Sequence, residues 1–219
     1  MADKYIPALG YDWLTRVYDP LVRLTTREIT FKRALIDQAD IHAGQRVLDL
    51  ACGTGTLAVL IKRKYPLTEV LGIDGDPKIL TIAIRKAEQN RVEIDFEEGM
   101  SSELPYADQS LDRVLSSLFF HHLTRRNKLI TLREAFRVLK PEGELHIADW
   151  GLPASFFMRI VSQGIRLLDG TETTDDNFSG LLPSLVTETG FHCAEVPTHF
   201  NSLFGTIRLI KAKKLGGLF

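Results

Sequence analysis

Short apolar or alternating runs are separated along the chain by longer segments in which apolar residues recur at helical spacing. The runs cover residues 47–50, 69–73, 92–96, 111–116 and 144–149. Runs of this length that are bounded by turn residues predict β-strands. Strands that alternate with helices predict a parallel sheet, and ligands bind such sheets at the carboxyl ends of the strands.

Capping residues and helix breakers set the limits of the predicted helices. Tyr65 and Pro66 stop the helix that follows a glycine-containing loop, and Asp76 with Pro77 starts the next one. The predicted helices cover residues 11–23, 27–39, 56–64, 77–90, 124–138, 156–168 and 179–189. Near the C-terminus, residues 191–196 and 203–211 are predicted to pair as an antiparallel hairpin, and the lysine cluster at 211–214 is interpreted as a solubilising tail.

Residues 150–178 interrupt the alternation of strands and helices, and their stretch 169–177 is polar. An insertion after the fifth strand would stand above the carboxyl edge of the sheet, where it could act as a lid. Residues 1–40 are interpreted as an N-terminal helical segment. Because the chain shows no repeat or linker, we expect one domain over residues 1–219.

The composition excludes several classes of protein. The 27 basic and 28 acidic residues nearly cancel, so a nucleic-acid partner is not favoured. No apolar run reaches the ~20 residues that span a bilayer, and residues 1–4 lack an apolar signal region. Cys52 and Cys193 give neither a disulfide framework nor a metal-ligand set. We therefore expect a cytoplasmic protein that binds no metal.

The main chemical signal lies where the first run meets two glycines. Residues 53–58 match the pattern GxGxx(G/A) of dinucleotide-binding loops, and Asp74 stands about 20 positions beyond it, where it could hold a ribose. A nicotinamide-dependent oxidoreductase therefore stays open. Asp49 argues against a dinucleotide, because its carboxylate would repel a pyrophosphate. It would attract the ammonium and sulfonium groups of S-adenosylmethionine (SAM), so Asp49 favours this cofactor.

The stretch 47–55 resembles the first motif of the class I SAM-dependent methyltransferases. Later motifs of the family are matched in the same order by residues 72–74, 99–106, 111–123 and 137–145. The similarity covers residues 40–150 and is greatest to the small-molecule branch that includes ubiquinone/menaquinone C-methyltransferases. It implies a Rossmann-like, doubly wound α/β fold with seven strands. The sheet would be mostly parallel, with helices on both faces and the C-terminal hairpin antiparallel.

The resemblance also implies a cofactor site. Asp49 would hold the methionine ammonium, Asp74 the ribose hydroxyls, and Gly53 and Gly55 would leave room for the ligand. The residues assigned to SAM are Asp49, Ala51, Gly53, Gly55, Asp74, Gly75, Met100, Ser101 and Ser117. Relatives usually carry an acid that contacts the adenine amino group at the position of Met100. We expect Met100 to pack on the adenine ring instead.

Catalytic residues are not fixed by the sequence, because methyl transfer depends on positioning and does not always need an acid or base. His121 and His122 are candidates for a proton acceptor, and Asp149 is a candidate for a contact with the substrate. We expect a small, apolar or aromatic methyl acceptor. A non-catalytic module that binds SAM or S-adenosylhomocysteine also stays open, as does the choice between a monomer and a homodimer.

Overall fold

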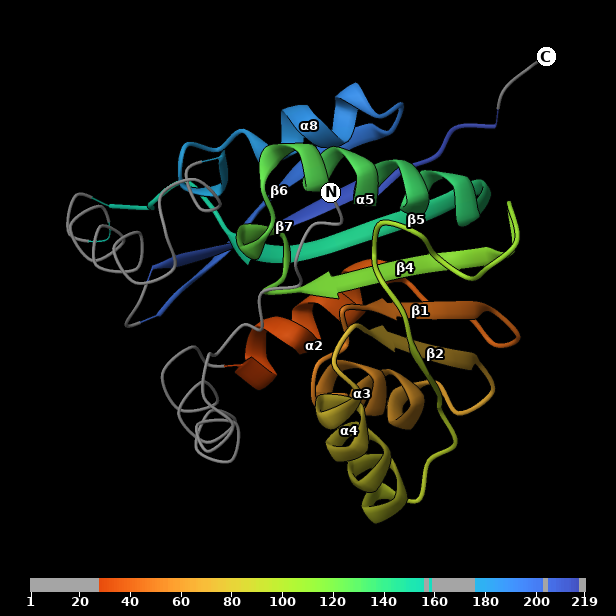
Figure 1. Ribbon diagram of the computed structural model, residues 1–219. Coiled ribbons are helices and arrows are strands. Elements are labelled where there is room, and N and C mark those ends of the chain that lie inside the picture. Colours follow the sequence, from red (N-terminus) through yellow and green to blue (C-terminus); the bar gives the residue numbers. More distant parts are fainter. Residues whose placement is uncertain (1–27, 156–157, 159–175, 203–204, 217–219) are drawn as a thin grey trace.

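The computed structural model describes residues 28–155, 158, 176–202 and 205–216, which form one seven-stranded sheet with helices on both faces (Figure 1). The strands are β1 (Arg46–Leu50), β2 (Glu69–Asp74), β3 (Asp95–Glu98), β4 (Leu111–Ser117), β5 (Leu139–Trp150), β6 (His192–Asn201) and β7 (Thr206–Lys213). Their spatial order is β3-β2-β1-β4-β5-β7-β6. The predicted seven-stranded α/β fold is confirmed.

The strand order places the switch point of the sheet between β1 and β4. The first five strands pair in parallel, whereas β7 runs antiparallel to both β5 and β6. The carboxyl ends of β1 to β5 therefore meet at one edge. This edge is where an open α/β sheet binds its ligands.

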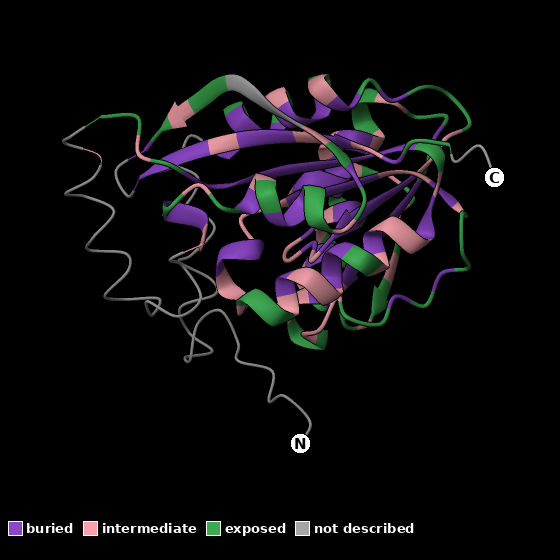
Figure 2. Cartoon of the chain, turned by 90° about the horizontal axis from the view of Figure 1, so that it is seen from above, coloured by how far each residue is buried: buried purple, intermediate pink, exposed green. Residues whose placement is uncertain are grey.

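The described helices lie on opposite faces of this sheet. They are α2 (Glu28–Ala39), α3 (Thr56–Lys64), α4 (Pro77–Asn90), α5 (Arg125–Val138) and α8 (Leu182–Glu188), with a short 3-10 helix, η1 (Phe120–His122). Helices α2, α3 and α4 cover one face, and α5 and α8 cover the other (Figure 1). A hydrophobic core lies on each face, and Figure 2 shows the buried strands between the two helical layers. None of the described helices is long and apolar enough to cross a membrane.

Most predicted helix limits are confirmed. Asp76 caps α4 by accepting a hydrogen bond from the backbone N–H of Lys78, and Pro77 takes the first helical position. Thr124 caps α5 in the same way, with the N–H of Asn127 as donor. The predicted helix 179–189 is shorter in the structure, because α8 begins only at Leu182 after a turn.

The start of the third strand and the start of the fifth strand differ from the prediction, each for a local reason. The third strand begins at Asp95 instead of residue 92, because the N–H of Val92 still bonds the carbonyl of Ala87 and closes α4. The predicted turn at 141–143 lies within β5. There Glu142 adopts a φ of 66°, and the pairing with β4 shifts by a bulge.

The C-terminal hairpin is confirmed, with β6 longer than predicted and β7 shifted towards the C-terminus. The lysine cluster that follows is not a tail, because Lys211 and Lys213 lie in β7. Lys214 is buried, and its Nζ donates to the carbonyls of Phe136 and Leu139. The helix predicted at 11–23, most of that at 156–168 and most of the lid lie outside the described residues.

Candidate active site

Asp49 joins the end of β1 to the start of α3. Its side chain is buried, and Oδ2 accepts a hydrogen bond of 2.9 Å from the N–H of Ala58 in the first turn of the helix. Gly55, which precedes the helix, has no side chain to do this. Within the described part of the chain, Oδ1 accepts no hydrogen bond. Burial raises the pKa of Asp49 to about 7, although the positive charge of Lys32 on α2 lowers it.

The loop after β1 contains three residues in the left-handed region, and its two glycines have different surroundings. Ala51, Gly53 and Gly55 have φ values of 56°, 53° and 73°. A Cβ on Gly55 would lie 2.9 Å from Cβ of Ala83, so this glycine allows α3 and α4 to pack closely. A Cβ on Gly53 would meet nothing within 4 Å. The open space beside the loop is therefore at Gly53.

Asp74, at the end of β2, holds this loop in place. Its Oδ2 accepts a hydrogen bond of 2.8 Å from the N–H of Gly53, and its Oδ1 accepts one of 3.1 Å from the N–H of Asp76. Burial raises the pKa of Asp74, and its charge also raises the pKa of Asp49. Gly75 follows and is half-buried. Two acids with raised pKa values at neighbouring strand ends form a site that a bound cation would stabilise.

The next strand ends contribute Met100, Ser101 and Ser117. The N–H of Gly99 bonds the carbonyl of Asp74, which brings the loop after β3 beside the end of β2. Met100 is 45% exposed, so it is free to cover a ligand, whereas the Ser101 hydroxyl lies 2.9 Å from that of Thr131 on α5. Ser117 is half-buried at the end of β4.

Asp149 is a buried acid near the end of β5. Its Oδ1 lies 2.7 Å from Nδ1 of His121 and accepts a bond from the N–H of Trp150. Its Oδ2 accepts bonds from the N–H groups of Phe119 and His121. Burial would raise the pKa of Asp149, but His121 and these donors outweigh burial and lower it. The carboxylate therefore fixes both the β4–α5 loop and the ring of His121.

His122 has a different environment from His121. The two rings lie 3.9 Å apart, and burial together with the neighbouring His121 lowers the pKa of His122 to about 3. His122 is therefore neutral near pH 7 and is a poor proton acceptor there. His121 has its Nδ1 directed at Asp149, which leaves Nε2 as the ring atom that can exchange a proton.

Comparison with known proteins shows which family the chain resembles. Residues 47–143 match the family model described as a methyltransferase domain. A demethylmenaquinone methyltransferase of Thermus thermophilus is 38% identical over 62% of this chain and 62% of its own. The ubiquinone/menaquinone biosynthesis C-methyltransferase UbiE of Rubrivivax gelatinosus is 33% identical over 57% of this chain and 47% of its own. Residues 47–143 are therefore similar to a methyltransferase domain.

A solved structure agrees with this assignment at the level of the fold. The SAM-dependent methyltransferase from Aquifex aeolicus superposes with a TM-score of 0.70 over 97% of this chain and 100% of its own, at 17% identity. The chain spans only 62% of the Thermus relative and 57% of a demethylmenaquinone methyltransferase of Deinococcus radiodurans. The comparisons therefore show a likeness to methyltransferase domains in sequence and in fold.

S-adenosyl-L-methionine is the cofactor of this class, and the residues of the methyltransferase domain fit it. The open side of Gly53 leaves room for a ligand against the loop backbone. Asp49 and Asp74, with raised pKa values, suit a ligand that is cationic and carries no phosphate.

Two residues near the edge were missed in the sequence. Lys32 forms a buried ion pair of 2.6 Å with Glu28 and adds positive charge beside Asp49. Asn177 is fully buried near the end of β5. Neither gives a sequence signal, because Lys32 is a single lysine in a helix and Asn177 lies in a polar stretch that resembles a surface loop.

Proposed function

We propose that the protein transfers the methyl group of SAM to a small-molecule acceptor. The observation that carries this proposal is Asp49. This acid is buried at the end of β1, keeps Oδ1 without a hydrogen bond among the described residues, and precedes the loop in which Gly53 borders open space. A cation that fills this space would relieve the cost of burying the carboxylate.

In this proposal a protein side chain contacts each end of the cofactor. We assign the methionyl ammonium to Asp49 and the ribose hydroxyls to Asp74. The Asp74 oxygens already accept backbone N–H groups, but a carboxylate oxygen has more than one lone pair and can accept a hydroxyl as well. Met100, which is 45% exposed in the loop after β3, would pack on the adenine ring.

His121 is the better candidate for a proton acceptor. SAM supplies a methyl group on a positively charged sulfur, and an acceptor attacks it most readily after losing a proton. Asp149 orients the His121 ring, so Nε2 would take a proton from the acceptor while the acceptor's nucleophilic carbon or oxygen bonds the methyl carbon. The carbon–sulfur bond breaks, and its electrons remain on sulfur in S-adenosylhomocysteine. Asp149 would then be a positioning residue.

The acceptor is proposed to be small, apolar or aromatic, and the enzyme to be one cytoplasmic domain. Nearly balanced charge gives no support to a nucleic-acid substrate. The relatives named as demethylmenaquinone methyltransferases make reduced demethylated quinones the first acceptors to assay. Sedimentation of the full chain would decide between a monomer and a homodimer.

Calorimetry and a transfer assay test the proposal. We expect SAM and S-adenosylhomocysteine to bind and NAD not to bind. With an accepted substrate, His121→Asn should lower turnover without changing cofactor affinity. Binding without transfer to any of a broad acceptor panel would favour the non-catalytic module. Binding of NAD in place of SAM would favour an oxidoreductase.

A further inference from the structure

A lysine on α4 contacts the loop after β1, residues 51–56. Helices α3 and α4 lie side by side (Figure 1), and the side chain of Lys86 extends from α4 to this loop. Its Nζ donates one hydrogen bond of 2.8 Å to Oγ1 of Thr54 and another of 2.8 Å to Oγ1 of Thr56. One ammonium group therefore holds both residues that flank Gly55.

The backbone of this loop depends on such contacts for its shape. Ala51, Gly53 and Gly55 all have φ values in the left-handed region, which is disfavoured for a residue with a Cβ such as Ala51. A backbone of this kind persists only where its neighbours hold it. Asp74 holds the N–H of Gly53 from the end of β2, and Lys86 holds the residues that follow from α4.

The polar contact with α4 is separate from the apolar one. Ala83, one turn before Lys86, packs closely against Gly55 and needs no lysine to do so. An ammonium group has N–H donors and no acceptor, so both threonine hydroxyls accept hydrogen bonds from Lys86. The packing of α3 on α4 can therefore persist without Lys86, whereas the positions of the two threonine side chains depend on it.

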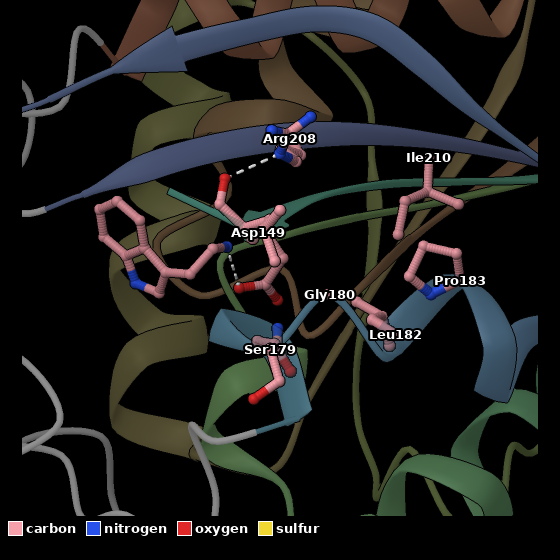
Figure 3. A pocket seen from close by; sticks show the side chains of 11 residues that line it. Asp149, Ser179, Gly180, Leu182, Pro183, Arg208 and Ile210 are labelled. Atoms are coloured by element: carbon pink, nitrogen blue, oxygen red, sulfur yellow. Dashed lines mark hydrogen bonds between the residues drawn. The ribbon is translucent and has the colours of Figure 1, made fainter. Parts of the chain in front are cut away.

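A second loop at this edge, between β4 and α5, is held in a different way. The buried Asp149 accepts the N–H of Trp150 (Figure 3) and those of Phe119 and His121, so its loss would leave buried donors without an acceptor. Lys86 is half-buried, and the threonine hydroxyls that it contacts are also half-buried. Without the lysine these hydroxyls can bond water or each other, since their oxygens are 3.5 Å apart. Its loss should therefore have little effect on stability.

We propose that Lys86 is a positioning residue of the cofactor site, and that it orders the loop at Gly53 through the hydroxyls of Thr54 and Thr56. The inference rests on the proposed function. A loop that is ordered before binding gives a higher affinity, because less conformational entropy is lost when the ligand arrives. A Cβ on Gly53 would meet open space, so a movement of the adjoining Thr54 changes the surface that the cofactor would contact.

Lys86→Met tests this role, because methionine keeps the length of the side chain and a high helix propensity but has no N–H donor. The ligand is S-adenosylhomocysteine, which lacks the sulfonium charge, and its binding to the full chain is measured by calorimetry. We expect affinity to fall about fivefold, as for the loss of a hydrogen bond. Lys86→Arg keeps the charge and the donors and should bind within about twofold of the natural chain. Equal affinity of Lys86→Met and the natural chain would overturn the inference.

Lys62→Met is the matched control. Lys62 is half-buried on α3, and its Nζ donates to the carbonyl of Thr68, which precedes β2. Each methionine variant loses one positive charge and the hydrogen bonds of one lysine, so their melting temperatures should be similar. Only Lys86→Met should lose affinity for S-adenosylhomocysteine. An equal loss of affinity in both variants would assign the effect to charge or stability and contradict the proposal.

Amide hydrogen exchange of the protein without ligand shows whether the loop itself is affected. In Lys86→Met the N–H of Gly53, which bonds Asp74, should exchange about fivefold faster. The N–H of Leu118, which bonds the carbonyl of Ala148 in another part of the sheet, should keep its rate. Equal acceleration at both amides would indicate a loss of global stability and reject a local role for Lys86.

Replacement of both threonines shows whether Lys86 acts through them. Thr54→Val with Thr56→Val removes the two hydroxyls, so adding Lys86→Met to this double variant should not weaken binding of S-adenosylhomocysteine further. A further loss of about fivefold would mean that Lys86 acts on the ligand directly, and would overturn its positioning role. If the natural chain itself does not bind S-adenosylhomocysteine, the proposed function fails and this inference with it. If the natural chain binds and Lys86→Met binds equally well, only this inference fails.

Discussion

Asp49 and Asp149 lie in the two halves of the sheet, near the carboxyl ends of β1 and β5, and are 1% and 2% exposed. Asp49 accepts one backbone hydrogen bond, and burial raises its pKa to about 7. Asp149 accepts three backbone N–H groups and faces the ring of His121, so its pKa is lowered in spite of burial. Equal burial thus gives opposite shifts, because the neighbouring His121, together with the hydrogen bonds to Asp149, outweighs the effect of burial.

Under the proposed function, this difference separates an acid that binds the cofactor from an acid that holds the loop around it. Asp149 has both oxygens hydrogen-bonded within the protein, and these bonds hold His121 and the β4–α5 loop. Asp49 keeps Oδ1 without a hydrogen bond among the described residues, and its pKa stays raised in spite of Lys32, so under the proposed function a bound cation is its partner. The predictions below test this contrast from the largest expected effect to the smallest.

Asp149→Ala should lower the free energy of unfolding by about 3–5 kcal/mol, because it leaves buried donors without an acceptor. Urea unfolding near neutral pH measures the loss. Asp149→Asn is the matched control, since its amide oxygen still accepts some of these bonds, and its loss should be smaller. A loss below about 1 kcal/mol for Asp149→Ala would mean that the carboxylate does not hold the loop.

Asp49→Asn should weaken cofactor binding without lowering the stability of the fold. The amide oxygen can still accept the N–H of Ala58, but the charge is gone, so SAM binding should weaken by about 3 kcal/mol. The folded state raises the pKa of Asp49 above its unfolded value of 3.8, so this group disfavours folding as pH rises towards 7 and beyond. The variant should therefore be as stable as the natural chain, or more stable, near pH 8. Calorimetry and urea unfolding on one preparation check both statements.

The fold could be predicted from the sequence where local patterns determine it, and not where contacts with distant segments do. Strands β1, β2 and β4 are short apolar runs, and the starts of α4 and α5 have side-chain caps, so local patterns reveal them. The start of β3 and the bulge in β5 depend on backbone bonds to other segments. Lys214 shows the same limit, because a lysine near a chain end resembles a tail until Phe136 is seen to pack against it.

The residues of the candidate site could also be predicted only in part. Asp49, Gly53 and Asp74 stand in a recognisable motif, so their meeting at one edge could be predicted. Nothing in the sequence tells that Asp149 is satisfied internally and Asp49 is not, since both are single acids at strand ends. The separate roles of Gly53 and Gly55 also depend on Ala83, which lies on another helix. Residues of this kind acquire their roles only through tertiary neighbours.

Asp74→Ala should weaken SAM binding by about 2 kcal/mol, through loss of a charge-assisted hydrogen bond to the ribose and a looser Gly53 loop. Asp76→Ala is the matched control two residues away. It removes the cap of α4 and should cost about 1 kcal/mol of stability while leaving cofactor affinity intact. Equal cofactor affinity in the natural chain and Asp74→Ala would remove Asp74 from the binding site.

The natural chain should bind SAM more tightly as pH rises through about 7. The free protein has Asp49 about one-tenth ionised near pH 6 and about half ionised near pH 7, because burial raises its pKa to about 7. Only the ionised form attracts the methionyl ammonium, so affinity should rise about fivefold over this interval, equivalent to about 1 kcal/mol. The ligand's own amino group titrates near 7.8 and stays protonated over most of this range. Asp49→Asn lacks the titrating group, and its affinity should be flat over the same interval. If the affinity of the variant for SAM rose equally with pH, another group would control binding. Asp49 would then have a structural role, like Asp149.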